Sequence, residues 1–189
     1  MKVDIKVPCG KSGDWAVEEM NLSEEDVKLH NLRAAMHGDC RFVPAGNYKR
    51  LTYKNSVIMS NTPAECDDFL YFVNCYETKG NILINGLGLG VLLTALLEKP
   101  DVEHVTVIEI SEDVIKLVGP TFAEDLRVTI IHADAFIWKL PKGVRYNAVW
   151  HDIWPTICED NLPEMTKLHR KYGKRCDYQE SWCRELCKR

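Results

Sequence analysis

The chain has 189 residues, of which 46% are hydrophobic, and a formal net charge of −4. This is enough apolar material for a full core, so we expect one domain with a small appended element. No stretch approaches the roughly 18 apolar residues of a membrane span, and the N-terminus lacks the apolar core of a secretory signal. These features exclude an integral membrane protein and predict a cytoplasmic one. The eight cysteines form no C-x-x-C pair, so reduced thiols are expected and no metal site is predicted.

A short strand and a helix are predicted near the N-terminus. Residues 2–7 alternate polar and apolar side chains before Pro8, which is typical of an edge strand. A helix is expected after Ser23, a good N-cap that is followed by three acidic residues. The side chains expected on its apolar face, and the residue expected to end it, are Leu29, Leu32, Met36 and Gly38.

A hairpin and a second helix are predicted next. Residues 48–53 and 56–60 flank Lys54-Asn55, a pair suited to a hairpin turn. The sequence TPAE then opens a helix, with Thr62 as cap and Glu65 completing a capping box. We therefore divide the chain into a strand, helix and hairpin element at residues 1–60 and a main domain at residues 61–189.

The stretch 81–90, NILINGLGLG, dominates the main domain. Its apolar residues run into glycines at 86, 88 and 90 and then into a second apolar run, which predicts a buried strand, a tight turn and a helix. Gly86, Gly88 and Gly90 would let a ligand approach the backbone and the N–H groups of the helix. A nucleoside-bearing cofactor fits such a turn, although a turn without a ligand is the alternative. The third glycine of a dinucleotide fingerprint would fall on Val91, so this spacing differs from that fingerprint.

Strands and helices alternate after this turn, which predicts a parallel sheet and an α/β fold. Glu109, Asp134 and Asp152 each follow or end one of the later predicted strands, at 104–110, 127–132 and 146–150. Ligands bind such sheets at the carboxyl ends of the strands, so we expect the three carboxylates to share one rim with the glycines.

Each carboxylate on this rim has a chemical role available. Glu109 could accept hydrogen bonds from both hydroxyls of a ribose, and Asp134 from the amino group of an adenine. Asp152 could orient or deprotonate an amine or hydroxyl nucleophile. His132 and His151 flank these residues, but histidines at strand ends more commonly bond to the backbone than to a metal.

Four segments resemble the successive motifs of class I S-adenosylmethionine-dependent methyltransferases, and most of all their spermidine synthase-like branch. They are NILINGLGLG, VTVIEISEDVIKLV, RVTIIHADAF and YNAVWHDIWP, within residues 45–155. The resemblance implies a Rossmann-like sheet and S-adenosylmethionine as cofactor. It also implies site residues: Gly86, Gly88 and Gly90 at the methionine end, Glu109 and Ile110 at the ribose, Asp134 and Ala135 at the adenine, and Asp152 with His151 at the reacting group.

The chain departs from the aminopropyltransferases of that branch at two positions. Those enzymes usually carry an aspartate inside the glycine turn, where Leu89 stands here. They carry a second one in the motif that begins at Asp152, where this chain reads DIWP. Without these carboxylates a dicationic polyamine would be poorly neutralised, so methyl transfer to a less cationic acceptor fits better.

The C-terminal part predicts a helix and no further strand. The helix is expected between Asn161, as cap, and Gly173, with Glu164 at its third position. A sheet truncated after its fourth strand would leave an open edge, so we expect a homodimer. Residues 167–189 hold eight Lys or Arg against three acidic residues. A solvated helical face explains this charge, although binding to nucleic acid is not excluded.

Together these patterns predict a methyltransferase that uses S-adenosylmethionine and a small-molecule acceptor. An aminopropyltransferase of polyamine synthesis is the first alternative. A non-catalytic binding or assembly protein that keeps the fold is the second, because a fold does not fix a function.

Overall fold

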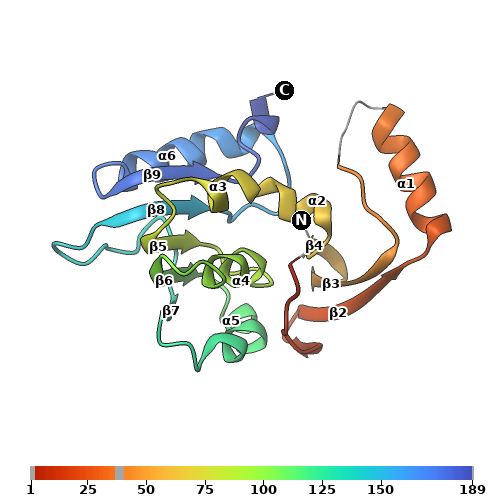
Figure 1. Ribbon diagram of the computed structural model, residues 1–189, viewed down its shortest axis with the longest axis horizontal. Coiled ribbons are helices and arrows are strands. Elements are labelled where there is room, and N and C mark those ends of the chain that lie inside the picture. The colour runs from red at the N-terminus through yellow and green to blue at the C-terminus, as the bar shows by residue number, and fades with distance from the viewer. Residues whose placement is uncertain (1–2, 37–40, 189) are drawn as a thin grey trace.

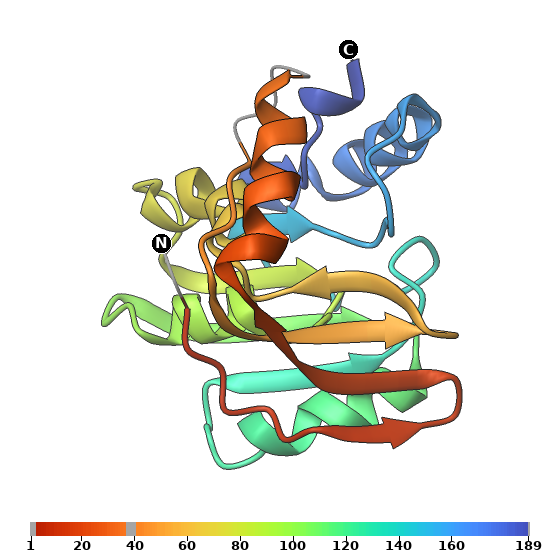
Figure 2. The same ribbon diagram turned by 90° about the vertical axis from the view of Figure 1, so that its right-hand side faces the viewer.

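The computed structural model describes residues 3–36 and 41–188, which form two sheets (Figure 1). The N-terminal sheet is antiparallel with the strand order β1-β2-β3-β4, and in Figure 2 it lies in front of the second sheet. Its predicted hairpin is confirmed: Lys54 and Asn55 have φ values of 49° and 65°, as a tight two-residue turn requires. The strands are β1 Gly10–Ser12, β2 Trp15–Leu22, β3 Gly46–Tyr53 and β4 Ser56–Ser60.

The second sheet is parallel throughout and has the strand order β7-β6-β5-β8-β9. The predicted α/β, Rossmann-like fold is therefore confirmed. Strand β5 leads into the glycine turn at the point where the strand order reverses, which is the usual position of a ligand crevice. The strands are β5 Gly80–Asn85, β6 Val102–Glu109, β7 Val128–His132, β8 Tyr146–His151 and β9 Cys176–Ser181.

Both faces of this sheet are covered. Ile82 and Ile84 of β5 belong to one core, shared with α4, α5 and the N-terminal sheet, while Leu83 belongs to a second core with α6. Two-sided burial explains why β5 is a continuous apolar run rather than an alternating one. The helices are α1 Glu24–Met36, α2 Pro63–Asp68, α3 Leu70–Asn74, α4 Val91–Leu97, α5 Glu112–Val118 and α6 Leu162–Tyr172, with short 3₁₀ turns η1 Gly119–Phe122, η2 Glu159–Asn161 and η3 Leu186–Lys188.

The predicted N-terminal strand is wrong for its described part, residues 3–7, which pair with no sheet. Val3, Ile5 and Val7 are nevertheless buried in the core, so the alternation correctly predicts an inward face. Side chains take the place of a strand partner: the amide of Asn61 donates to the carbonyl of Val3, and the ammonium of Lys49 to that of Val7.

Helix α1 is confirmed, but its predicted apolar face is wrong. Leu29, Leu32 and Met36 are 52%, 57% and 77% exposed. The side-chain amide of Asn31 accepts from the N–H of Val43 and donates to its carbonyl, both at 2.9 Å. These two hydrogen bonds fix the rotation of the helix about its axis. Val27 and Ala34 are the residues of α1 that are buried. Gly38 lies outside the described residues.

The expectation that no strand follows Asp152 is also wrong, because β9 pairs in parallel with β8 and gives the sheet a fifth strand. The residues of β9, CDYQES, are mostly polar and partly buried, as is common on an edge strand. No apolar run therefore marks this strand in the sequence. The predicted homodimer stays a prediction.

The longest helix of the described residues, α1, has 13 residues, and none in that part is long and apolar enough to cross a membrane.

Two predicted helix caps are formed differently from the expectation. The carboxylate of Glu65 accepts from the N–H and hydroxyl of Ser60, at 2.8 and 2.7 Å, and not from Thr62. The side chain of Asn161 donates to the carbonyl of Thr156 and caps no helix. The helices themselves are confirmed, because Pro at their first turns and apolar burial fix them without these caps.

Part of the basic charge near the C-terminus has a structural use. Lys171 donates to the carbonyls of Ala135 and Trp138, at 2.7 and 2.6 Å, and Arg175 donates to that of Val144. These bonds tie α6 and the residue before β9 to the loop between β7 and β8. Both expectations for the remaining basic charge, a solvated face and nucleic-acid binding, stay predictions.

Candidate functional site

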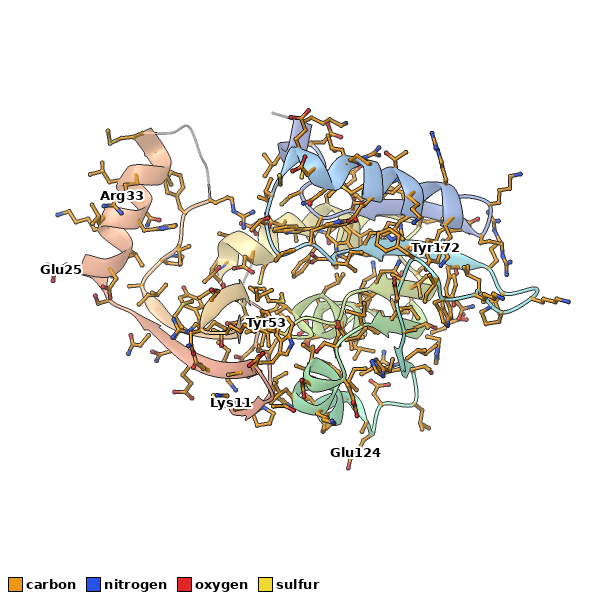
Figure 3. All side chains as sticks on the ribbon, turned by 180° about the vertical axis from the view of Figure 1, so that it is seen from behind. Lys11, Glu25, Arg33, Tyr53, Glu124 and Tyr172 are labelled. Carbon is orange, nitrogen blue, oxygen red and sulfur yellow. The ribbon has the colours of Figure 1, made fainter. Side chains whose placement is uncertain are left out.

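A cavity of about 960 Å³ opens between the N-terminal sheet and the carboxyl ends of the parallel strands. Its volume suits a cofactor together with a small second ligand. In Figure 3 the labelled Tyr53, which lines this cavity, lies where the N-terminal sheet meets the rest of the molecule. The predicted site residues that line it are Gly86, Gly88, Glu109, Ile110, Asp134, Ala135 and Asp152.

The glycine turn meets this cavity through Gly86 and Gly88, whose φ values are 100° and 51°. A Cβ on Gly86 would lie 1.9 Å from the backbone oxygen of Asp152, and one on Gly88 would lie 2.2 Å from the sulfur of Met59. A side chain at Gly86 would therefore overlap backbone, whereas at Gly88 the positive φ is the main constraint, because the thioether of Met59 can move. Gly90, at φ 71°, is not among the lining residues and instead begins α4 against Phe122.

We expect Gly86→Ala to lower the free energy of unfolding by more than about 2 kcal/mol, because backbone strain and overlap with a backbone atom add. Gly143→Ala is a matched control: Gly143 also has a left-handed φ, of 78°, but a Cβ at this position would have nothing within 4 Å. Urea denaturation of both variants gives the two losses in free energy of unfolding. The difference between them is the part due to overlap with the backbone of Asp152, because Gly143→Ala has only the backbone strain. Equal losses in the two variants would contradict the close approach of Asp152.

Glu109 ends β6 with its carboxylate fixed at the turn. One oxygen accepts from the N–H of Leu87 and the other from that of Ser111, each at 2.8 Å. The side chain is only 8% exposed. A carboxylate can accept about four hydrogen bonds, so two positions remain for a ligand. Ile110 follows on the rim and is 67% exposed.

Asp134 and Ala135 line the cavity beyond β7. One carboxylate oxygen of Asp134 accepts from the N–H of Phe136 at 2.7 Å, which orients the side chain. The carbonyl of Ala135 accepts from the hydroxyl of Tyr172 and the ammonium of Lys171. These bonds fix the segment so that a flat group could lie against Ala135, which is 5% exposed, with Asp134 at its edge.

Asp152 follows β8, and its backbone N–H donates to the carbonyl of Asn85 at 2.8 Å. Burial raises the pKa of Asp152 to about 7, and the nearby carboxylates of Asp68 and Glu65 act in the same direction. At neutral pH this side chain can therefore both take and release a proton, as a general base does.

His151 does not reach the cavity, although it is adjacent to Asp152. Its ring is fully buried on the side of α6, where the amide of Asn85 donates to Nδ1 at 2.8 Å and Nε2 donates to Gln179 at 3.3 Å. Burial lowers the pKa of His151 to about 3, so the ring is neutral at pH 7. The geometry thus gives His151 a structural position, against the predicted catalytic one.

This buried ring predicts a loss of stability in acid. The unfolded chain takes up a proton near pH 6.5 and the folded one only near pH 3, so stability present above pH 6.5 falls as the pH drops through this range. Between pH 7 and pH 5 the loss is about 2 kcal/mol at about 1.4 kcal/mol per pK unit. We expect His151→Gln to remove this part of the pH dependence, measured by urea denaturation at both pH values. An unchanged difference between pH 7 and pH 5 would show that the ring is not held neutral.

The cavity is also lined by residues that no sequence motif indicated as part of a site. Trp15, Tyr53 and Met59 come from the N-terminal sheet, Glu65 from α2, and Trp182 from the segment after β9. They converge only because the two sheets pack together, which no local pattern records. Among the described residues, no group of three or more His, Cys, Asp or Glu side chains could hold a metal ion.

Comparisons with known proteins give only distant similarities. No protein-family model matches the chain, and no curated protein matches it in sequence. Among solved structures, it is similar to the CcbJ methyltransferase from Streptomyces caelestis, with 20% identity over 51% of this chain and 38% of that one and a TM-score of 0.42.

Two other solved structures give similar values. One is a dimethyladenosine transferase from Plasmodium falciparum, with 21% identity over 56% of this chain and 36% of that one and a TM-score of 0.42. The other is the N-methyltransferase NodS from Bradyrhizobium japonicum WM9, with 13% identity over 52% of each chain and a TM-score of 0.42. The chain thus matches about half or less of the length of these three proteins. Likenesses of this size do not indicate what the chain does.

Proposed function

We propose that the protein is a methyltransferase that uses S-adenosylmethionine and a small-molecule acceptor. The observation that carries the proposal is the convergence of Gly86, Gly88, Glu109, Asp134 and Asp152 on one cavity from four different segments. Packing alone gives no reason for three carboxylates to meet at a glycine turn.

The residues present fit this cofactor. Gly86 and Gly88 line the cavity at the turn, where the methionine end would lie, and Glu109 keeps two acceptor positions for ribose hydroxyls. Asp134 can accept from an adenine amino group beside Ala135. When bound, the cofactor supplies a methyl group on a positively charged sulfur. The chain then has to align the acceptor, exclude water and take a proton, and Asp152 stands where it can do the last.

Two observations favour methyl transfer over aminopropyl transfer. Leu89 occupies the place of one family carboxylate and is fully buried, and Trp154, in the motif that holds the other, is 7% exposed. Apolar packed side chains at both places cannot neutralise a dication. The experiment is incubation with S-adenosylmethionine or its decarboxylated form and a pool of amines, nucleobases and phenols, read by product mass. A methylated product supports the proposal, an aminopropyl product replaces it, and no product with either supports a non-catalytic binding protein.

A further inference from the structure

The lining of the cavity is rich in aromatic rings. Trp15 and Tyr53 of the N-terminal sheet pack together with their centroids 4.9 Å apart and their planes tilted by 44°. Trp154 and Trp182 line the same cavity from the C-terminal part of the chain. Flat apolar walls of this kind bury apolar groups and attract cations to their faces.

The charges on this cavity are strongly unbalanced. Its described lining includes a single basic residue, Arg41, and five carboxylates: Glu65, Glu109, Asp134, Asp152 and Glu164. Arg41 is held in an ion pair by Asp68, which also accepts from the indole N–H of Trp182 at 3.0 Å. The guanidinium of Arg41 therefore faces the carboxylates of both Asp68 and Glu65, and its single charge cannot balance the two.

Glu65 and Asp152 are two of the lining carboxylates that have no proposed role in holding the cofactor. Burial raises the pKa of each, and the nearby carboxylate of Asp68 adds to the shift, while the hydrogen bonds from Ser60 and the charge of Arg41 oppose it at Glu65. Negative charge in an apolar site is costly unless a positive group pairs with it. A single ammonium would supply that group, and the buried apolar side chains of Leu89 and Trp154 offer no carboxylate to a second one.

We infer that the acceptor is a monoamine with an aromatic or bulky apolar tail, its nitrogen at Asp152 and Glu65 and its tail against Trp15 and Tyr53. This inference rests on the proposed function. In the transfer step, the ammonium first gives one proton to the carboxylate of Asp152. The free amine nitrogen then forms a bond to the methyl carbon, and the carbon–sulfur bond breaks with its electron pair left on sulfur. The products are a methylated ammonium, a neutral thioether and a protonated Asp152.

The test is calorimetry of the protein saturated with S-adenosylhomocysteine, using three probes: 2-phenylethylamine, its neutral analogue 2-phenylethanol, and putrescine. We expect the aromatic amine to bind at least tenfold more tightly than either of the others. Equal or tighter binding of the alcohol or of putrescine, or no binding of the aromatic amine, would overturn the inference. Saturation by S-adenosylhomocysteine is measured first, so its failure would count against the proposed function and not against the acceptor.

Two variants sharpen this test. Glu65→Gln keeps one of the two oxygens that accept from Ser60 and removes the charge, so amine affinity should fall about tenfold while S-adenosylhomocysteine binds within threefold of wild type. Glu112→Gln is the matched control, because Glu112 is exposed on α5, pairs with Lys116 and lies outside the cavity. Amine affinity that is unchanged by Glu65→Gln, in a protein of wild-type melting temperature, would remove Glu65 from the acceptor site.

Discussion

Replacement of Glu109 by alanine is expected to weaken binding of S-adenosylmethionine by about 10- to 150-fold. Hydrogen bonds to a charged group are worth about 1.5–3 kcal/mol, which corresponds to this range. Two effects act together in the variant: the ribose hydroxyls lose their acceptor, and the N–H groups of Leu87 and Ser111 lose theirs. Calorimetry with S-adenosylmethionine and S-adenosylhomocysteine measures the loss.

A control variant on the same strand separates a specific loss of cofactor binding from a general loss of folded protein. Glu103 is exposed on β6, so Glu103→Ala should bind the cofactor as wild type does. Unchanged affinity in Glu109→Ala, or no binding of either compound by wild type, would remove the basis of the proposed function. Tight binding of NAD instead would show that the G-x-G-x-G spacing serves a dinucleotide.

The parallel sheet could be predicted from the sequence because burial on both faces leaves a plain signal. Strands such as β5 are continuous apolar runs, and Gly86, with its positive φ, marks where the chain turns. The edge strand β9 gives no such signal, since one side of it faces solvent. Residues 3–7 show the limit of periodicity: alternation predicts which side chains are inward, but not whether a neighbouring strand pairs with the backbone.

The site residues at the carboxyl ends of the parallel strands could be predicted from the sequence. Those contributed by the N-terminal part of the chain could not. Glu109, Asp134 and Asp152 each follow or end a strand of one parallel sheet, so topology alone brings them together. Trp15 and Glu65 reach the same cavity only through packing between sheets. His151 could have been placed correctly, because neighbouring residues of a strand point to opposite faces, and Asp152 already faced the ligand side.

Asp152→Asn is expected to lower turnover by about 10²-fold or more while cofactor affinity stays within threefold of wild type. A positioned acid or base contributes at least this much, and asparagine keeps the shape of the side chain while removing its charge. Asp152 lines the cavity, but its carboxylate is not among the groups proposed to hold the cofactor, so binding and turnover should respond differently. Asp160→Asn is the control, because Asp160 is exposed on the turn before α6.

The pH dependence gives an independent measure of the same role. Burial raises the pKa of Asp152 to about 7, and only the ionised form can take a proton, so activity should rise as the pH increases through about 7. In Asp152→Asn this rise should disappear from the dependence of kcat/KM on pH, since the remaining activity no longer requires an ionised carboxylate. A variant that turns over at the wild-type rate and keeps the rise would give Asp152 a structural role. Loss of cofactor binding in the variant would instead place the side chain on the cofactor side of the cavity.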